Sequence, residues 1–103
     1  MGKMSRDKGK RGEREFATVL RDHGYKGRRG VQYHGGPDSP DVEGLPGFHI
    51  EVKRVERLNL YDALDQSKQD AGDGEIPIVA HRKNGKRWVV VMEAEDFFAI
   101  LDD

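Results

Sequence analysis

The chain of 103 residues contains no cysteine, which excludes disulfide bonds and thiolate metal sites. It also has no apolar run approaching the roughly 18 to 20 residues that cross a bilayer. The N-terminus is too polar for a secretory signal. These absences favour a cytoplasmic protein with no membrane partner.

Apolar and aromatic residues are scarce. Hydrophobic residues make up 35% of the chain and aromatic residues 8%, whereas charged residues make up 36%. A chain of this length and composition predicts one domain with a small core. Self-association would hide additional apolar surface.

The net charge of -1 conceals an asymmetry between the two parts of the chain. Residues 1–30 carry ten Lys or Arg and four acids, so this segment has a charge of +6 and the remainder -7. We interpret residues 1–9 as a flexible basic tail that binds phosphates, and residues 10–103 as the single domain. The alternative is a solvated leader that only aids solubility.

The periodicity of apolar residues predicts a first helix over 10–23. Phe16, Ala17 and Leu20 fall on one helical face, and Gly24 is placed to end the helix. Glu13 falls at the edge of this buried face. Glu15 is expected to point outward.

The following segment contains short β-prone stretches. Residues 31–33 predict a strand, and a Gly- and Pro-rich loop follows over 34–40. Residues 41–43 and 48–55 predict a hairpin around Gly44-Leu45-Pro46-Gly47. If Leu45-Pro46 forms a two-residue turn, Asp41 lies opposite Ile50 and diagonal to Glu51, and neighbouring registers leave the same groups close.

The second half of the chain predicts two helices and two strands. Asn59 is expected to cap a helix over 60–71, and Asn84-Gly85 to join strands at 76–82 and 87–92. A last helix is expected over 94–101.

The apolar residues of the last helix and Trp88 are assigned to the core. We expect Phe97, Phe98 and Leu101 of the last helix to be buried, although one phenylalanine is also a candidate dimer contact. Trp88 is assigned to the core rather than to base stacking, because it lies in a Val-rich predicted strand.

Charged residues of the predicted hairpin form the candidate functional site. Glu51 and Lys53 leave the same face of a strand, and the hairpin brings Asp41 beside them. Two carboxylates and an ammonium are the groups needed to hold a divalent metal against a phosphodiester. The alternative is a surface ion pair between Glu51 and Lys53. His49 shares their face and is a candidate phosphate contact.

These residues resemble a known signature. Pro40-Asp41 followed by Glu51-x-Lys53 resembles the PD-(D/E)xK nuclease superfamily. Lys8-Gly9-x-x-x-Glu13-Arg14 is similar to the KGxxxER signature of archaeal-type Holliday-junction resolvases. The pattern also resembles small phage and bacterial nucleases of this type.

The resemblance implies an α/β fold with a restriction-endonuclease-like αβββαβ core, in which helices flank a mixed central sheet. It also implies that Asp41, Glu51, the Val52 carbonyl and Glu13 bind Mg²⁺, for which Mn²⁺ could substitute. Lys53 would orient or deprotonate water or stabilise the transition state. Gln66 would lie on the helix after the catalytic strand.

Several residues are expected to contact nucleic acid. The candidates are Lys8, Lys10, Arg11, Arg14, Arg28, Arg29 and Ser39. Ser39 is the possible counterpart of a catalytic serine in the resolvases. Asp38 is a rival carboxylate, but it lies in the loop, so the ligand role is assigned to Asp41.

The function that we expect is Mg²⁺-dependent endonucleolytic cleavage of branched DNA, such as a four-way junction, by a homodimer. If the chain is phage-encoded, the site of action would be the host cytoplasm. The alternatives are a nuclease for nicks, flaps or single strands, and a non-catalytic nucleic-acid-binding module with the same fold.

Overall fold

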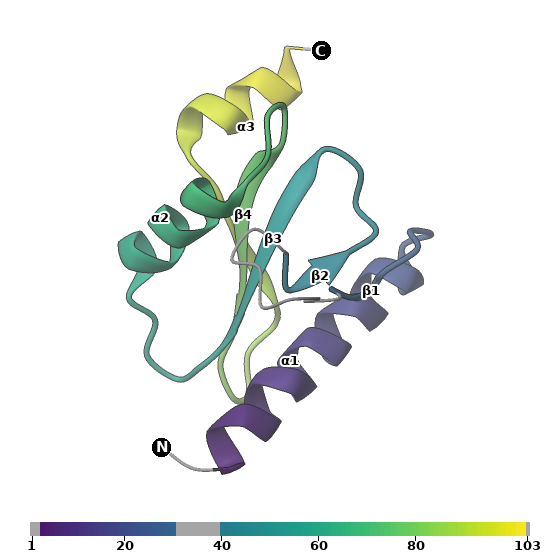
Figure 1. Ribbon diagram of the computed structural model, residues 1–103, viewed down its shortest axis with the longest axis vertical. Helices are drawn as coiled ribbons and strands as arrows, with labels where there is room; N and C mark the ends of the chain where they lie inside the picture. The colour runs from purple at the N-terminus through teal and green to yellow at the C-terminus, as the bar shows by residue number, and fades with distance from the viewer. Residues whose placement is uncertain (1–2, 31–39, 103) are drawn as a thin grey trace.

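A mixed sheet carries helices on both of its faces (Figure 1). The computed structural model describes residues 3–30 and 40–102, with side chains from residue 9 onward. The described elements run in the order α-β-β-β-α-β-β-α, and the first strand lies at residues 28–29, which were not predicted as a strand. Five strands form one sheet in the order β1-β2-β3-β4-β5. The predicted α/β class is therefore confirmed.

Helix α1 (Lys3–Asp22) is longer than predicted. It begins seven residues before Lys10, so residues 3–9 continue the helix where a flexible tail was expected. Lysine, arginine and methionine favour helix strongly enough to offset Gly9 and Gly12. Gly12 also has a packing role, since a Cβ there would lie 2.5 Å from the Cβ of Arg54.

The first three strands are β1 (Arg28–Arg29), β2 (Val42–Glu43) and β3 (Phe48–Arg54). The strand predicted at residues 31–33 and most of the loop at 34–40 lie outside the described residues. Val42, not Asp41, lies opposite Ile50, so the predicted register was wrong by one residue. The turn is centred on Pro46-Gly47 rather than on Leu45-Pro46, because Phe48 N–H donates a hydrogen bond to Leu45 O and Gly47 has a φ of +86°.

Strand β4 (Ile76–Arg82) pairs with β3 in parallel along its whole length. Parallel neighbours need a crossover, and α2 (Leu60–Asp70) provides it. Asn59 caps α2 as predicted, because its side chain accepts a hydrogen bond from Asp62 N–H. The helix ends one residue before the expected Ala71.

The two faces of the sheet are packed by different helices. On one face Ile50 and Val52 pack with residues of α1, and on the other Val79 packs with residues of α2. The α1 face holds the larger cluster: Phe16, Ala17, Leu20, Val42, Ile50, Val52, Ile78 and Ala80. Because side chains alternate along β3, His49, Glu51 and Lys53 share the α2 face.

The β4–β5 connection confirms the predicted turn. Lys86 N–H bonds Lys83 O, and Gly85 has a φ of +74°. Strand β5 (Val89–Val91) is shorter than predicted. Trp88 packs on Phe16 with the ring centres 5.1 Å apart, which confirms its assignment to the core.

Helix α3 (Ala94–Leu101) has the predicted bounds but not the predicted burial. Phe97, Phe98 and Leu101 are 48%, 58% and 62% exposed, so their assignment to the core was wrong. The helix follows an edge strand and extends past the end of the sheet (Figure 1), where no other element covers it in the described part of the chain. None of the helices described here is long and apolar enough to cross a membrane.

Candidate metal centre

The fold brings the two predicted carboxylates together. Asp41 directly precedes β2, and its Oδ2 accepts a hydrogen bond of 2.8 Å from Val52 N–H on β3. The carboxyl group of Asp41 also lies close enough to that of Glu51 to raise the pKa of Glu51. The one-residue change in register therefore leaves the two acids in contact.

Glu51 is a buried acid with an unusual pKa. Glu51 is 3% exposed to solvent. Burial, the negative charge of Asp41 and a hydrogen bond that protonated Glu51 donates to Asp41 raise the pKa of Glu51 to about 8, against the opposing effect of Lys53. Without another cation, Glu51 holds a proton at neutral pH. Such a carboxyl pair is suited to exchange that proton for a divalent cation.

Lys53 and Gln66, both candidate site residues, lie in contact. Lys53 Nζ donates a hydrogen bond of 3.3 Å to Gln66 Oε1, which joins β3 to α2. Both residues line a cavity of about 240 Å³, together with Arg57 and Asn59. The amine that attracts Glu51 therefore also borders an accessible polar space.

Glu13 approaches Asp41 from the α1 side. Burial raises the pKa of Glu13, the hydrogen bond from Arg29 lowers it, and the charge of Asp41 raises it again. Arg29 Nε lies 2.9 Å from Glu13 Oε1, so this predicted phosphate contact is paired with a predicted metal ligand. Arg28 is paired with Glu43 at 3.5 Å.

The remaining predicted ligand is the carbonyl of Val52. In an extended strand the N–H and C=O of one residue point to the same side. Since Val52 N–H bonds Asp41, its carbonyl is directed to the same side of β3. Asp41, Glu51 and this carbonyl are oxygen donors of the kind that Mg²⁺ and Mn²⁺ accept, so the residues fit the expected cation.

The predicted cationic residues of α1 are exposed. Lys10, Arg11 and Arg14 lie on its surface. Ser39, its neighbour Asp38 and the side chain of Lys8 lie outside the described residues. Glu15, expected to point outward, is half-buried and its Oε1 accepts a hydrogen bond of 2.7 Å from Arg82.

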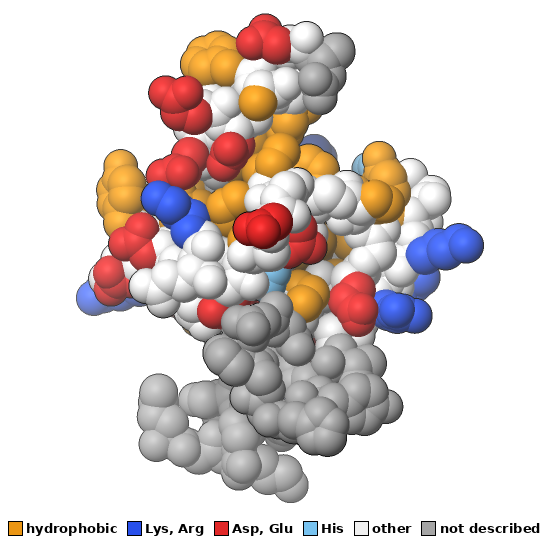
Figure 2. Space-filling view, turned by 45° about the horizontal axis from the view of Figure 1, so that its top comes forward, with side chains coloured by type: hydrophobic (Ala, Val, Ile, Leu, Met, Phe, Trp, Pro, Cys, Tyr) orange, Lys and Arg blue, Asp and Glu red, His pale blue; other side chains and the backbone are white. Residues whose placement is uncertain are grey.

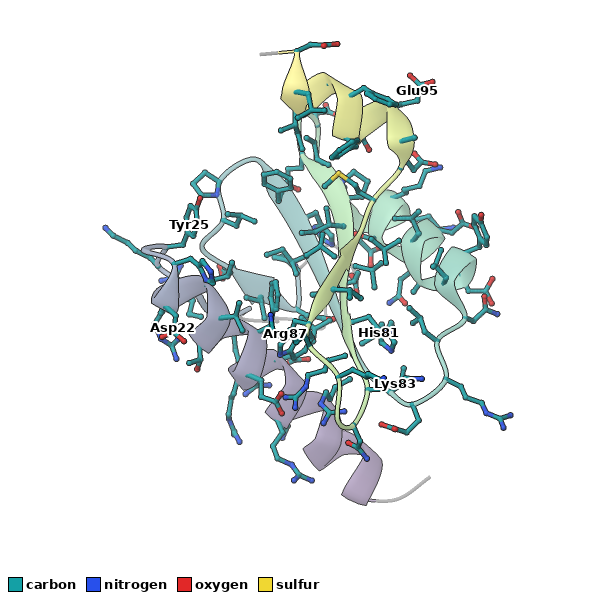
Figure 3. The ribbon with its side chains drawn as sticks, turned by 180° about the vertical axis from the view of Figure 1, so that it is seen from behind. Asp22, Tyr25, His81, Lys83, Arg87 and Glu95 are labelled. Carbon is teal, nitrogen blue, oxygen red and sulfur yellow. The ribbon has the colours of Figure 1, made fainter. Side chains whose placement is uncertain are left out.

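Sequence reasoning missed a second group of cations near α1. Figure 3 shows Lys83 and Arg87 at the β4–β5 connection, which lies beside the N-terminal half of α1. Arg11 and Asn84 line one cavity of about 260 Å³ between these elements. The sequence contained a signal for this group, because Lys83 and Arg87 lie on either side of the predicted Asn84-Gly85 turn.

Asp70 was not predicted as a site residue, and His49 was predicted only as a phosphate contact. With Glu51 they offer ligand atoms that all lie within 4.8 Å of one another. His49 is 0% exposed, so the prediction that it contacts a phosphate was wrong. The face of His49 was readable from strand alternation, but the position of Asp70 depends on the crossover through α2.

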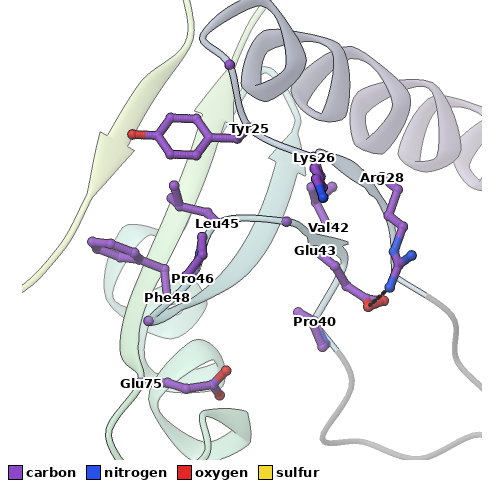
Figure 4. A pocket seen from close by; sticks show the side chains of 13 residues that line it. Tyr25, Lys26, Arg28, Pro40, Val42, Glu43, Leu45, Pro46, Phe48 and Glu75 are labelled. Carbon is purple, nitrogen blue, oxygen red and sulfur yellow. Dashed lines mark ion pairs between the residues drawn. The ribbon is translucent and has the colours of Figure 1, made fainter.

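A separate cavity lies away from the two carboxylates (Figure 4). It has a volume of about 740 Å³ and is bordered by Tyr25, Leu45 and Phe48, among others. Neither carboxylate of the candidate centre lines it. We therefore assign the chemistry to the carboxylates rather than to this cavity.

Comparison with known proteins agrees with this geometry. Neither a protein-family model nor a curated protein sequence matches the chain. Among solved structures, it is similar to Archaeoglobus fulgidus Hjc, a Holliday junction resolvase from an archaeal hyperthermophile. The TM-score is 0.63 at 28% sequence identity, covering 82% of this chain and 72% of Hjc.

The chain has the fold of an archaeal resolvase. The resemblance to resolvase-like PD-(D/E)xK nucleases is thereby confirmed. The restriction-endonuclease-like core is confirmed with it.

Proposed function

We propose that the chain is a divalent-metal-dependent endonuclease that cuts branched DNA. The observation that carries the proposal is the meeting of Asp41, Glu51 and Lys53 in an Hjc-like fold. A carboxyl pair beside the DNA would weaken binding by a protein that only binds DNA, because carboxylates repel phosphates. The same pair is useful to an enzyme that must hold a cation beside a phosphate.

The proposed ligands are Asp41, Glu51 and the Val52 carbonyl, with Glu13 nearby on α1. Bound there, Mg²⁺ or Mn²⁺ would neutralise charge on the phosphodiester and make the attacking water more acidic. Lys53 Nζ stabilises the negative charge that grows on the phosphate in the transition state. Gln66 orients Lys53 through its amide oxygen.

The basic residues of α1 are proposed to hold the DNA backbone. Arg11 and Arg14 are exposed, and the cations of the β4–β5 connection extend the same positive surface. Lys8, Lys10 and Ser39 remain candidates for phosphate contacts. Arg28 and Arg29 are tied to acids, so we assign Arg29 chiefly to holding Glu13.

We propose a homodimer formed through β5 and α3. Figure 2 shows orange hydrophobic side chains among acidic ones at the end of the molecule that α3 occupies. The exposed apolar residues of these elements are Val89, Val90, Phe97, Phe98, Ile100 and Leu101. A symmetric dimer would present two centres to two strands of a junction.

The proposal is tested by cleavage of linear, nicked, flap and four-way-junction DNA with Mg²⁺, Mn²⁺ or EDTA. We expect metal-dependent cutting of the junction by the unaltered protein. Asp41→Asn should abolish cutting and retain DNA binding, whereas Asp65→Asn, an exposed acid on α2, should cut normally. If flaps or nicks are cut in preference to the junction, they are the substrate instead. If the protein binds DNA but cuts none of these substrates with either metal, it is not a nuclease.

A further inference from the structure

Beyond the proposed catalytic centre, Glu51 belongs to a second group of potential ligands. His49, Glu51 and Asp70 each offer an atom, and these atoms lie within 4.8 Å of one another. His49 and Glu51 come from β3, and Asp70 from the end of α2. Neither Asp41 nor Lys53 is part of this group.

The imidazole of His49 is sealed inside the protein and incompletely paired. Its Nε2 lies 3.3 Å from Glu51 Oε1. Its Nδ1 is buried and has no hydrogen-bond partner among the described residues, with Glu75 Oε1 at 3.8 Å. Nε2 is the nitrogen directed at Glu51, so a cation held between them would replace this long contact and stabilise an incompletely paired buried ring.

Asp70 lies where electrostatics oppose a negative charge. It is the last residue of α2, at the negative end of the helix dipole. It is half-buried, and its charge adds to the effects that raise the pKa of Glu51. A cation between the two carboxylates would remove both sources of repulsion.

We propose that His49, Glu51 and Asp70 form a second divalent-cation site, which accepts a first-row transition ion such as Zn²⁺ or Mn²⁺ in preference to Mg²⁺. The preference follows from the imidazole, since Mg²⁺ favours oxygen ligands and retains its waters. Half-exposed Asp70 leaves this site open to solvent on the α2 side. Glu51 is the ligand that it shares with the proposed catalytic centre.

The first test observes the histidine rings of the full chain directly. Imidazole ¹⁵N signals are recorded by NMR while Zn²⁺ is added, with no DNA present. We expect one ring nitrogen of His49 to shift and the exposed His23 to serve as an internal reference. An unmoved His49 ring at saturating Zn²⁺ would overturn the proposal, as would the absence of Zn²⁺ binding at millimolar concentration.

The second test measures Zn²⁺ affinity by calorimetry in matched variants. Asp70→Asn should weaken Zn²⁺ binding by at least about 10-fold, because it removes a ligand. Asp65→Asn removes the same charge from the exposed side of α2 and should bind Zn²⁺ as the unaltered protein does. Equal affinity of the two variants would overturn the proposal.

A third variant separates this site from the proposed catalytic centre. Asp41→Asn should retain Zn²⁺ binding, with the same shift of the His49 ring. If Asp41→Asn abolishes binding while Asp70→Asn preserves it, Zn²⁺ occupies the Asp41–Glu51 pair instead and the proposal is wrong. None of these measurements uses DNA. Failure of the second cation site can therefore be distinguished from failure of the proposed nuclease function, on which the shared role of Glu51 rests.

Discussion

The two faces of β3 differ in what they contribute to the protein. On the face toward α1, Phe48, Ile50 and Val52 are apolar and pack in or against the main core, and only Arg54 at the end of the strand is charged; Ile50 is 0% exposed. The residues that face α2 are polar or charged, and two of them, His49 and Glu51, are just as deeply buried. One strand therefore stabilises the fold with alternate residues and places its chemistry with the others.

The comparison teaches that burial has opposite consequences on the two faces. Burial of Ile50 removes apolar surface from water and is favourable. Burial of Glu51 removes a carboxyl group from water and raises its pKa, which is unfavourable for the charged form. Substitutions that shrink or neutralise these neighbours should therefore separate stability from activity.

The largest expected effect on stability comes from the α1 face. Ile50→Ala should lower the free energy of unfolding by about 3 kcal/mol, because it leaves a cavity in the main core. Chemical denaturation measures this change. Leu60→Ala on α2 removes the same atoms from a residue that is 38% exposed, and it should cost about 1 kcal/mol or less.

The next prediction concerns the α2 face, where we expect a large loss of activity and a small gain in stability. Glu51→Gln should reduce junction cleavage by at least about 100-fold, because a carboxylate ligand is lost. In the metal-free protein at pH 8, the same change should raise the free energy of unfolding by about 1 kcal/mol, because repulsion from Asp41 is relieved. A Glu51→Gln protein that cuts normally would refute the site assignment.

The sequence predicted this division of β3 because strand alternation is a local property. The apolar flanks of Glu51 and Lys53, and the hairpin that brings Asp41 near, lie within about a dozen residues of one another. The sequence also predicted α3 correctly as a helix. Local patterns therefore account for the element order and for the acid pair.

The features that the sequence did not predict depend on distant contacts. Asp70 reaches Glu51 only because a parallel strand follows α2. The exposure of Phe97 and Phe98 depends on where α3 lies beyond the sheet, since an apolar helix has the same pattern whether it packs on its own chain or on a partner. The turn register depended on glycine conformations at Gly44 and Gly47.

A smaller effect concerns pH. The pKa of Glu51 is about 8 in the folded protein and near 4.5 when the side chain is unperturbed. Between these values the folded, metal-free protein holds a proton that the unfolded chain has released, so this stabilisation is complete at low pH and is lost as the pH rises through about 8. Thermal unfolding across this range measures the loss.

Metal binding should release the proton that Glu51 holds in the metal-free protein. At pH 6.5 a cation that binds Asp41 and Glu51 should displace about one proton, and above pH 9 almost none. Calorimetry in buffers of different ionisation enthalpy measures the proton release. Glu51→Gln is the control, and proton release that persists in this variant would assign the proton to another group.

The smallest effect extends the comparison to α1, whose inner residues pack on β3 while its outer arginines face solvent. Arg14→Ala should weaken DNA binding similarly for all sequences and reduce the dependence of log K on log salt by about one, since one phosphate contact is lost. Arg29→Ala should leave that slope nearly unchanged and weaken metal binding instead, because Arg29 is already paired with Glu13 at 2.9 Å. Fluorescence anisotropy across a salt series measures both slopes. If the two variants change the slope equally, Arg29 contacts phosphate as the sequence alone suggested, and its pairing with Glu13 is released when DNA binds.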